Sequence, residues 1–253
     1  MVEYEVRGHV ALLTINRPEA RNAVNDVVAQ TMTENLDKAE ADDNVWVIVL
    51  AAEGPVFCAG ADLKFINAGR AAELATPKGG FGGFVDYPRR KPVIVAVDGL
   101  ATAGGCEIAL ACDMIVASTN AAFGLAEVKR NLVAAGGGLY RLPKVIGKNV
   151  ALEVALTGEP LSPQRGYELG LVNRVTEPGE ALAGALELAE KIASNAPLAV
   201  WASRKLIIDA DWDDEATIKK NTGQAFMEIL SSEDTKEGLT AFIEKRPPEW
   251  KAR

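Results

Sequence analysis

The chain has 253 residues, enough for one large domain whose core needs no disulfide or metal to fold. Its 27 Lys and Arg against 35 Asp and Glu give a net charge of −8, which argues against a nucleic-acid binder, because such a protein needs a positive field. The single histidine, His9, excludes a His-rich metal site, and we expect no bound metal.

The predicted elements begin with short strands that alternate with helices. Strands at Tyr4–Val6 and Val10–Ile15 are followed by a helix that Asn25 and Asp26 cap. Helical segments near 62–69 and 104–112 then lie between apolar runs. Three such β-branched runs predict buried strands: Val47–Ala51, Val93–Val97 and Met114–Ala117. This alternation favours an α/β fold with parallel βαβ units and helices on the sheet faces.

The second half of the chain reads as mostly helical. Ser162-Pro163 is a typical helix start, and Ser194 to Pro197 is a plausible hinge. Helical patterns fill most of residues 180–194, 198–209, 214–230 and 234–244. We expect an α/β core over residues 1–195 and a helical C-terminal subdomain over residues 196–253.

Cysteines and apolar runs bear on the cellular location. Cys58, Cys106 and Cys112 have no CxxC spacing, which indicates a reducing compartment and small buried side chains. The first ten residues show no leader pattern, and no apolar run approaches the length of a membrane span. We therefore expect a soluble, cytoplasmic protein without membrane contact.

Two loops with glycines follow predicted strands, at Phe57–Lys64 and Gly99–Glu107. Small residues there let a ligand approach the backbone, and a helix that begins at Gly104 presents unpaired N–H groups. Two such loops could offer two amide donors to one oxygen, which is an oxyanion hole. The alternative is that both are ordinary strand-to-helix turns. Neither is a GxGxxG or P-loop motif, so dinucleotide and P-loop readings are excluded.

Two glutamates next to apolar residues are candidate acid and base groups. Glu107 lies in the first turn of the helix that starts at Gly104, and Glu127 follows a small-residue loop. Environment-tuned carboxyl groups of this kind can exchange protons with a substrate. The alternative is structural: Glu107 would complement the helix dipole, and Glu127 would pair with Lys129 or Arg130. The basic run Arg89-Arg90-Lys91 is interpreted as solvated, with contact to an anionic ligand as the alternative.

These segments together resemble the crotonase (enoyl-CoA hydratase/isomerase) superfamily from end to end. The resemblance rests on matching segments in the same order: Ile15–Pro18, Arg21–Ala23, Phe57–Lys64, Lys91–Asp113, Phe123–Leu142, Leu156–Gly158, Gly170–Val172 and Phe242–Arg246. It implies a crotonase-like ββα spiral core with a helical C-terminal subdomain. It also implies assembly of that subdomain into homotrimers or homohexamers.

The resemblance implies a role for each matching position. The backbone N–H groups of Ala61 and Gly104 would hold the thioester carbonyl of an acyl-CoA substrate. Glu107 would be the base that activates water for attack on C3, and Glu127 would protonate C2. The implied coenzyme A contacts are Ala59, Ala61, Asp62, Leu63, Lys64 and Gly104, with Phe226 and Lys245 near the C-terminus. Coenzyme A is then part of the substrate, and no separate cofactor is expected.

Departures from the family pattern affect the choice of reaction. Ala126 replaces the usual proline before the second glutamate. Ala103 replaces the first glycine of the usual three-glycine loop, and Gly104 and Gly105 are kept. The segment Gly80–Val85, with the residues after Glu127, looks closer to carnitinyl-CoA (crotonobetainyl-CoA) dehydratases. The resemblance predicts an enoyl-CoA hydratase. The alternatives are carnitinyl-CoA dehydration, another crotonase reaction such as isomerisation or hydrolysis, and a non-catalytic acyl-CoA-binding or RNA-binding homologue.

Overall fold

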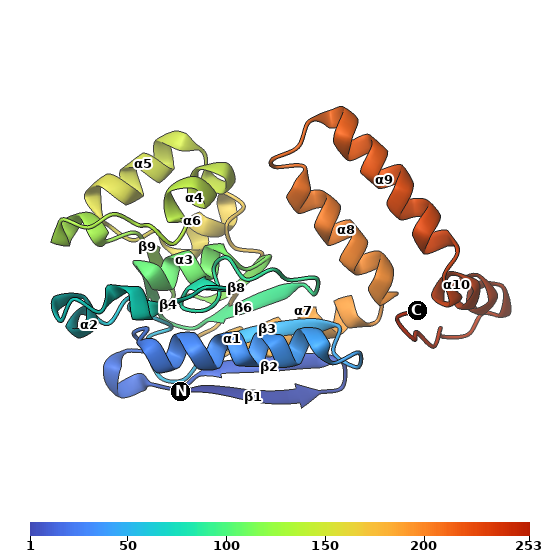
Figure 1. Ribbon diagram of the computed structural model, residues 1–253, viewed down its shortest axis with the longest axis horizontal. Helices are drawn as coiled ribbons and strands as arrows, with labels where there is room; N and C mark the ends of the chain where they lie inside the picture. Colours follow the sequence, from blue (N-terminus) through green and yellow to red (C-terminus); the bar gives the residue numbers. More distant parts are fainter.

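The computed structural model describes residues 1–253, and its centre is a six-stranded sheet (Figure 1). The strand order is β1-β2-β3-β6-β8-β10; β1 pairs antiparallel with β2, and the other neighbours are parallel. The strands are β1 (Val2–Arg7), β2 (Val10–Ile15), β3 (Val47–Ala52), β6 (Val93–Val97), β8 (Met114–Ser118) and β10 (Arg174–Thr176). The predicted parallel α/β sheet is confirmed.

Both faces of the sheet are buried, as the continuous apolar runs require. Alternate residues of one strand enter two separate cores: Leu13 packs with helix α1 (Asp26–Ala41), and Leu12 lies in the core that includes α7 (Ala181–Ala193). Asn25 caps α1 by accepting a hydrogen bond from the N–H of Val28 at 2.9 Å, as its position in the sequence predicted.

A second layer stands on the α1 face of the sheet and carries the candidate loops. Its strands β7 (Leu100–Thr102) and β9 (Ala122–Gly124) pair in parallel, and β4 (Ala75–Thr76) pairs with β5 (Gly80–Phe81). Its helices are α2 (Leu63–Asn67), α3 (Gly104–Leu110), α4 (Gly138–Ile146), α5 (Lys148–Thr157) and α6 (Pro163–Glu168). Three short 3₁₀ segments complete it: Pro18–Ala20, Ala71–Leu74 and Glu127–Arg130.

The last three helices extend away from this body (Figure 1). They are α8 (Pro197–Asp209), α9 (Glu215–Leu230) and α10 (Glu233–Glu244). Helix α9 buries none of its residues in this chain. The division into a core and an assembly subdomain stays a prediction. None of the helices is long and apolar enough to cross a bilayer.

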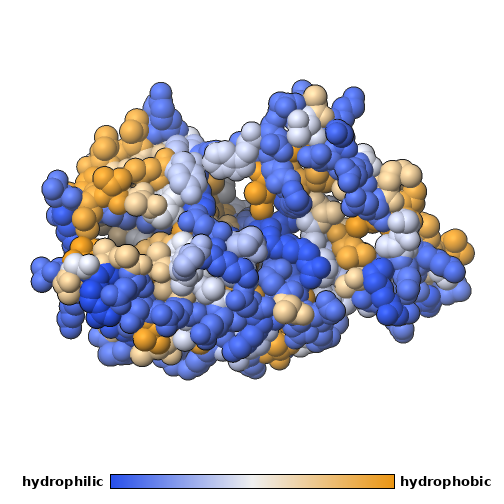
Figure 2. Space-filling view, in the orientation of Figure 1, coloured by the Kyte–Doolittle hydropathy of each residue, from blue (hydrophilic) through white to orange (hydrophobic).

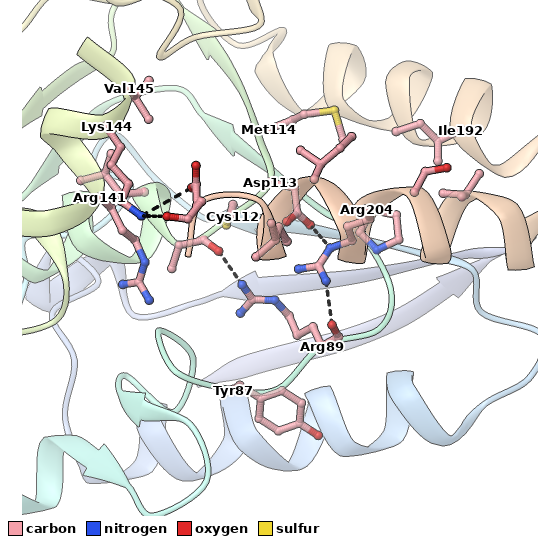
Figure 3. Close-up of a pocket in the computed structure, with 18 of the residues that line it drawn as sticks. Tyr87, Arg89, Cys112, Asp113, Met114, Arg141, Lys144, Val145, Ile192 and Arg204 are labelled. Carbon is pink, nitrogen blue, oxygen red and sulfur yellow. Dashed lines mark hydrogen bonds and ion pairs between the residues drawn. The ribbon is translucent and has the colours of Figure 1, made fainter. Parts of the chain in front are cut away.

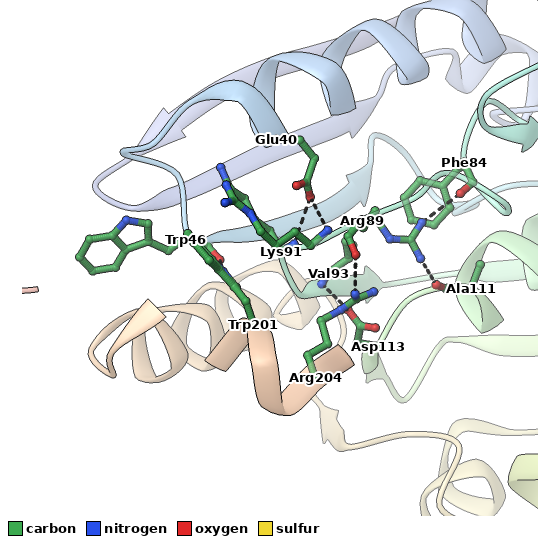
Figure 4. Close-up of polar contacts among 11 residues, drawn as sticks. Glu40, Trp46, Phe84, Arg89, Lys91, Val93, Ala111, Asp113, Trp201 and Arg204 are labelled. Carbon is green, nitrogen blue, oxygen red and sulfur yellow. Dashed lines mark hydrogen bonds and ion pairs between the residues drawn. The ribbon is translucent and has the colours of Figure 1, made fainter. Parts of the chain in front are cut away.

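The basic run Arg89-Arg90-Lys91 was expected to be solvated, which holds for the exposed Arg90 but is wrong for Lys91 and for the partly buried Arg89 (Figure 4). Lys91 is fully buried, because its Nζ donates to the carbonyls of Ala39 and Asp42 at 2.6 Å each and so satisfies the C-terminal end of α1. The guanidinium of Arg89 donates to the backbone carbonyls of Phe84 and Ala111. On α8, Arg204 bonds Asp113 at 2.8 Å and the carbonyl of Arg89 at 2.7 Å, which fixes α8 to the core.

Candidate active site

The two candidate loops lie side by side and are bonded to each other. Cys58 donates to the carbonyl of Leu100 at 3.2 Å, and Thr102 donates to the carbonyl of Cys58 at 3.0 Å. A Cβ added to Gly60 would lie 2.9 Å from the nitrogen of Gly104, and one added to Gly105 would lie 2.7 Å from the carbonyl carbon of Cys58. Glycine at these positions is what permits the close approach.

Two backbone donors are left free where the loops meet. Val24 donates to Gly60 and accepts from Asp62, each at 2.8 Å, so the N–H of Ala61 points away from this pairing. Gly104 is the first residue of α3, where helix geometry leaves the N–H without a partner. Neither N–H donates a hydrogen bond within the chain. Two free donors on adjacent rigid loops are the arrangement that stabilises a developing oxyanion.

Ala103 holds a conformation that ordinary residues avoid, immediately before this helix. Its φ of 50° and ψ of −128° place a Cβ-bearing residue in a region that suits glycine. Its N–H donates to the carbonyl of Gly124 at 2.8 Å, so the backbone is fixed by β9.

We expect Ala103→Gly to raise the free energy of unfolding by about 1 kcal/mol, because relief of strain exceeds the entropic cost of glycine. Urea unfolding of the two proteins measures the difference. Activity should be retained, since the Gly104 N–H is unchanged. A decrease in stability would show that Ala103 is not strained.

Glu107 lies one helical turn beyond Gly104, and its carboxylate is held by the loop before α4. Its exposed fraction is 3%, and Oε1 accepts a hydrogen bond from the N–H of Gly138 at 2.9 Å. A Cβ on Gly136 would lie 2.7 Å from Oε2. Burial raises the pKa of Glu107, and the N–H donors of Gly138 and Gly136 partly offset this by lowering it. The hydrogen bond from Gly138 therefore fixes the orientation of the Glu107 carboxylate.

Glu127 begins the 3₁₀ segment after β9, and both of its carboxylate oxygens are buried without a hydrogen-bond partner. Burial raises its pKa to about 7, and the negative charge of Glu107 contributes in the same direction. The expected alternative was an ion pair with Lys129 or Arg130. It is wrong, because Lys129 bonds Glu159 at 2.6 Å and Glu127 forms no ion pair with either residue. Buried polar atoms normally have partners, so this carboxyl is built to meet something other than the chain itself.

The raised pKa predicts how stability depends on pH. Below about pH 4.5 the Glu127 carboxyl is protonated in the folded and the unfolded chain, so it has no effect. As pH rises toward 7 only the unfolded chain releases this proton, and the folded state loses up to about 3 kcal/mol relative to a variant without the carboxyl. We expect Glu127→Gln to be more stable than wild type at pH 8 and no more stable at pH 4.5.

Urea unfolding at the two pH values measures this effect. Glu159→Gln is the matched control, since the Glu159 side chain is 72% exposed. An equal gain for both variants at pH 8, or none for Glu127→Gln, would contradict the prediction.

Arg141 on α4 is a residue of the site that the sequence did not single out. Its guanidinium donates to the carbonyl of Gly136 at 2.9 Å and to that of Val85 at 2.7 Å. It therefore ties the loop that holds Glu107 to the segment that follows β5. Only the place of Arg141, three residues after the glycine run, could have drawn attention to it.

The other residues expected to contact coenzyme A differ in their burial and in the elements to which they belong. Ala59 and Ala61 belong to the same loop, whereas Leu63 and Lys64 are exposed on the first turn of α2. Asp62 is buried, caps α2 and forms a 2.9 Å ion pair with Arg17. Its side chain thus supports the turn, while the neighbouring Lys64 is free to meet a ligand.

Phe226 and Lys245 are not brought to this site within one chain. Phe226 lies on α9 with 64% of its surface exposed, and Lys245 follows α10. Figure 1 shows α2 and α10 at opposite ends of the long axis of the molecule. If these residues act at a site of this kind, it belongs to another copy of the chain.

A cavity of about 1070 Å³ lies between α8 and the core (Figure 3). Arg141, Lys144, Ile192 and Arg204 are among its lining residues, and neither Glu107 nor Glu127 lines it. Figure 2 shows the molecule hollowed between the tail and the body. The cavity is thus bounded by the tail, and it touches the candidate site only through Arg141.

Free amide donors and two buried carboxyl groups on one layer above a six-stranded sheet define a protein built to stabilise an oxyanion during proton transfer. The family model described as Enoyl-CoA hydratase/isomerase matches residues 5–253. The chain belongs to this family, and the resemblance to the crotonase superfamily and its fold is confirmed.

Individual relatives match over nearly the full length. The short-chain-enoyl-CoA hydratase of Clostridium acetobutylicum is 39% identical, over 96% of this chain and 94% of that protein. The carnitinyl-CoA dehydratase of Proteus mirabilis is 37% identical, over 98% and 97%. The crystal structure of an enoyl-CoA hydratase from Mycobacterium tuberculosis H37Rv has a TM-score of 0.95 and 44% identity, over 100% and 99%.

Proposed function

We propose that the protein is an enoyl-CoA hydratase, a hydro-lyase that adds water across the C2=C3 bond of a trans-2-enoyl-CoA to give a 3-hydroxyacyl-CoA. The observation that carries the proposal is the buried, unpartnered carboxyl of Glu127 beside Glu107, on the same layer as the free N–H groups of Ala61 and Gly104. Full-length relatives named as hydratases support it.

In this mechanism the thioester oxygen accepts hydrogen bonds from Ala61 and Gly104. Glu107, oriented by Gly138, removes a proton from water as the water oxygen bonds to C3. The C2=C3 electrons move toward the carbonyl, and the two amides stabilise the enolate oxygen. Glu127, with its pKa raised to about 7, is available as an acid near neutral pH and donates its proton to C2. A proton passing from Glu107 to Glu127 then restores both groups.

Coenzyme A is the part of the substrate by which the protein binds it, and no separate cofactor takes part. We propose that Lys64, exposed on α2, meets a phosphate of coenzyme A, together with Ala59 and Leu63 along its path. Phe226 and Lys245 would contribute to the site of a neighbouring copy. The apolar side chains exposed on α9 and α10 support assembly into a homotrimer or homohexamer, since Phe242 is 84% exposed and Ile243 is 77% exposed. A cytoplasmic location belongs to the same proposal.

A hydration assay tests the function. The purified protein is mixed with trans-2-enoyl-CoA thioesters of increasing chain length, and loss of the absorbance of the conjugated double bond is followed. The expected result is hydration of at least one thioester. No hydration of any thioester in the panel would refute the proposal.

Carnitinyl-CoA dehydration is the second candidate, because the chain resembles a carnitinyl-CoA dehydratase almost as closely as a short-chain hydratase. The same machinery performs it, with the proton transfers reversed. Crotonobetainyl-CoA is therefore included in the panel. A kcat/KM for it far above that for trans-2-butenoyl-CoA would select this function over the first.

A further inference from the structure

The hairpin β4–β5 and the residues after it end on helix α3, beside the oxyanion donors. A Cβ on Gly104 would lie 2.5 Å from Cζ of Phe81, so the Phe81 ring directly covers the Cα of Gly104. A Cβ on Gly82 would lie 3.1 Å from Cδ1 of Ile108. The hairpin thus contacts α3 at two positions four residues apart, which share one face of the helix.

Glu107 lies three residues after Gly104, so the two residues are neighbours on the surface of α3. The Phe81 hairpin borders one side of the space in front of Gly104 and Glu107, and the Gly136–Gly138 loop borders another, because Gly138 bonds the Glu107 carboxylate. A thioester oxygen held by the Gly104 N–H must come within about 3 Å of that nitrogen. The atoms bonded to its carbonyl carbon then lie next to the Phe81 ring.

The position of this ring is set by the backbone. Gly80, Gly82 and Gly83 all have positive φ, and a Cβ on Gly83 would lie 2.9 Å from the carbonyl carbon of Ala29 on α1. Gly82 donates to Leu74 at 2.8 Å, and Phe84 donates to the carbonyl of Phe81 at 3.2 Å. A glycine-built turn of this kind leaves the ring little freedom to retreat from a larger ligand.

We propose that Phe81 determines specificity at C2 of the acyl group: its ring selects enoyl thioesters that are unsubstituted at C2 and excludes those with a C2 methyl branch. The inference rests on the proposed hydratase function. The ring borders the carbonyl end of the acyl group, so it acts on substituents at C2 more than on the length of the chain beyond C4. A difference of one methyl group in such a pocket changes kcat/KM by about 10- to 200-fold.

The experiment compares trans-2-butenoyl-CoA with its 2-methyl derivative and with trans-2-hexenoyl-CoA, in wild type, Phe81→Leu and Phe81→Ala. We expect wild type to prefer the unbranched butenoyl substrate strongly. Both variants should raise the ratio of kcat/KM for the 2-methyl substrate to that for butenoyl-CoA by at least about tenfold. The hexenoyl-to-butenoyl ratio should change much less.

Phe84→Leu is the matched control, because the Phe84 ring is fully buried under the guanidinium of Arg89 and belongs to the same segment. It should lower the unfolding temperature without changing either substrate ratio. Failure of wild type to hydrate any thioester refutes the function itself. With an active wild type, three results would each overturn the inference alone. The first is an unchanged ratio of kcat/KM for the 2-methyl substrate to that for butenoyl-CoA in both Phe81 variants. The others are an equal loss of kcat/KM on all three substrates in the variants, and equal kcat/KM of wild type for the branched and unbranched butenoyl thioesters.

Discussion

Glu107→Gln and Glu127→Gln are each expected to lower kcat for enoyl-CoA hydration by about 10²- to 10⁴-fold, since each removes one proton-transfer group from the reaction. Glutamine keeps the size of the side chain. At position 107 its amide oxygen can still accept the hydrogen bond from Gly138, so the loop before α4 should keep its place.

Steady-state hydration rates measure this effect, and far-ultraviolet circular dichroism confirms that the variants are folded. Glu159→Gln, which alters an exposed carboxylate paired with Lys129, is the control and should keep wild-type kcat. Unchanged rates in either active-site variant would remove that glutamate from the mechanism. A large loss at Glu107 with none at Glu127 would indicate a reaction that needs a single carboxylate.

Gly105→Ala is expected to destabilise the fold by about 3 kcal/mol or more and to abolish most activity, because the new methyl group would meet the backbone carbonyl of Cys58. That carbonyl cannot rotate aside as a side chain could. The only relief is to separate the two loops, which moves the N–H of Ala61 away from that of Gly104.

Urea unfolding and hydration rates together test this prediction. Gly223→Ala is the matched control: Gly223 lies inside α9 with nothing near the position of the added Cβ. Alanine there should be neutral or stabilising by about 0.5–1 kcal/mol, because it is the better helix former. A Gly105→Ala protein as stable and active as wild type would show that the loops are not tightly packed.

The main sheet and the tail were largely predictable from sequence because their signals are local. The runs Val10–Ile15 and Val93–Val97 are the strands β2 and β6 to the residue, since a continuous apolar run suits a strand buried on both faces. Ser162 caps α6 by accepting from Arg165 at 3.2 Å, as a serine before proline predicts.

The small strands of the second layer left no such signal. Strands β7 and β9 have three residues each, and β4 and β5 have two, so no alternation can develop. The burial of Lys91 was equally out of reach, because the carbonyls that it satisfies lie about fifty residues away on α1.

For the candidate site, the sequence identified the chemistry but not the supports. The two glutamates and two glycine-containing loops could be named, and the resemblance gave them roles. The hydrogen bond from Gly138 to Glu107 forms only because α4 approaches α3. The contact of Phe81 with Gly104 depends on a turn that contains four glycines between residues 79 and 83. Contacts of this kind are set by tertiary packing and have no period in the chain.

Arg141 donates one hydrogen bond to the carbonyl of Gly136 and another to that of Val85. One guanidinium therefore links the segment that limits the size of the acyl group to the loop that orients the catalytic carboxylate. A shift of the hairpin backbone that admits a bulkier acyl group would pull, through this guanidinium, on the loop that orients the Glu107 carboxylate. Broadening the range of substrates by moving the backbone would therefore slow turnover on every substrate. Shortening the Phe81 side chain leaves this link untouched, so it offers a way to change selectivity without that loss of rate.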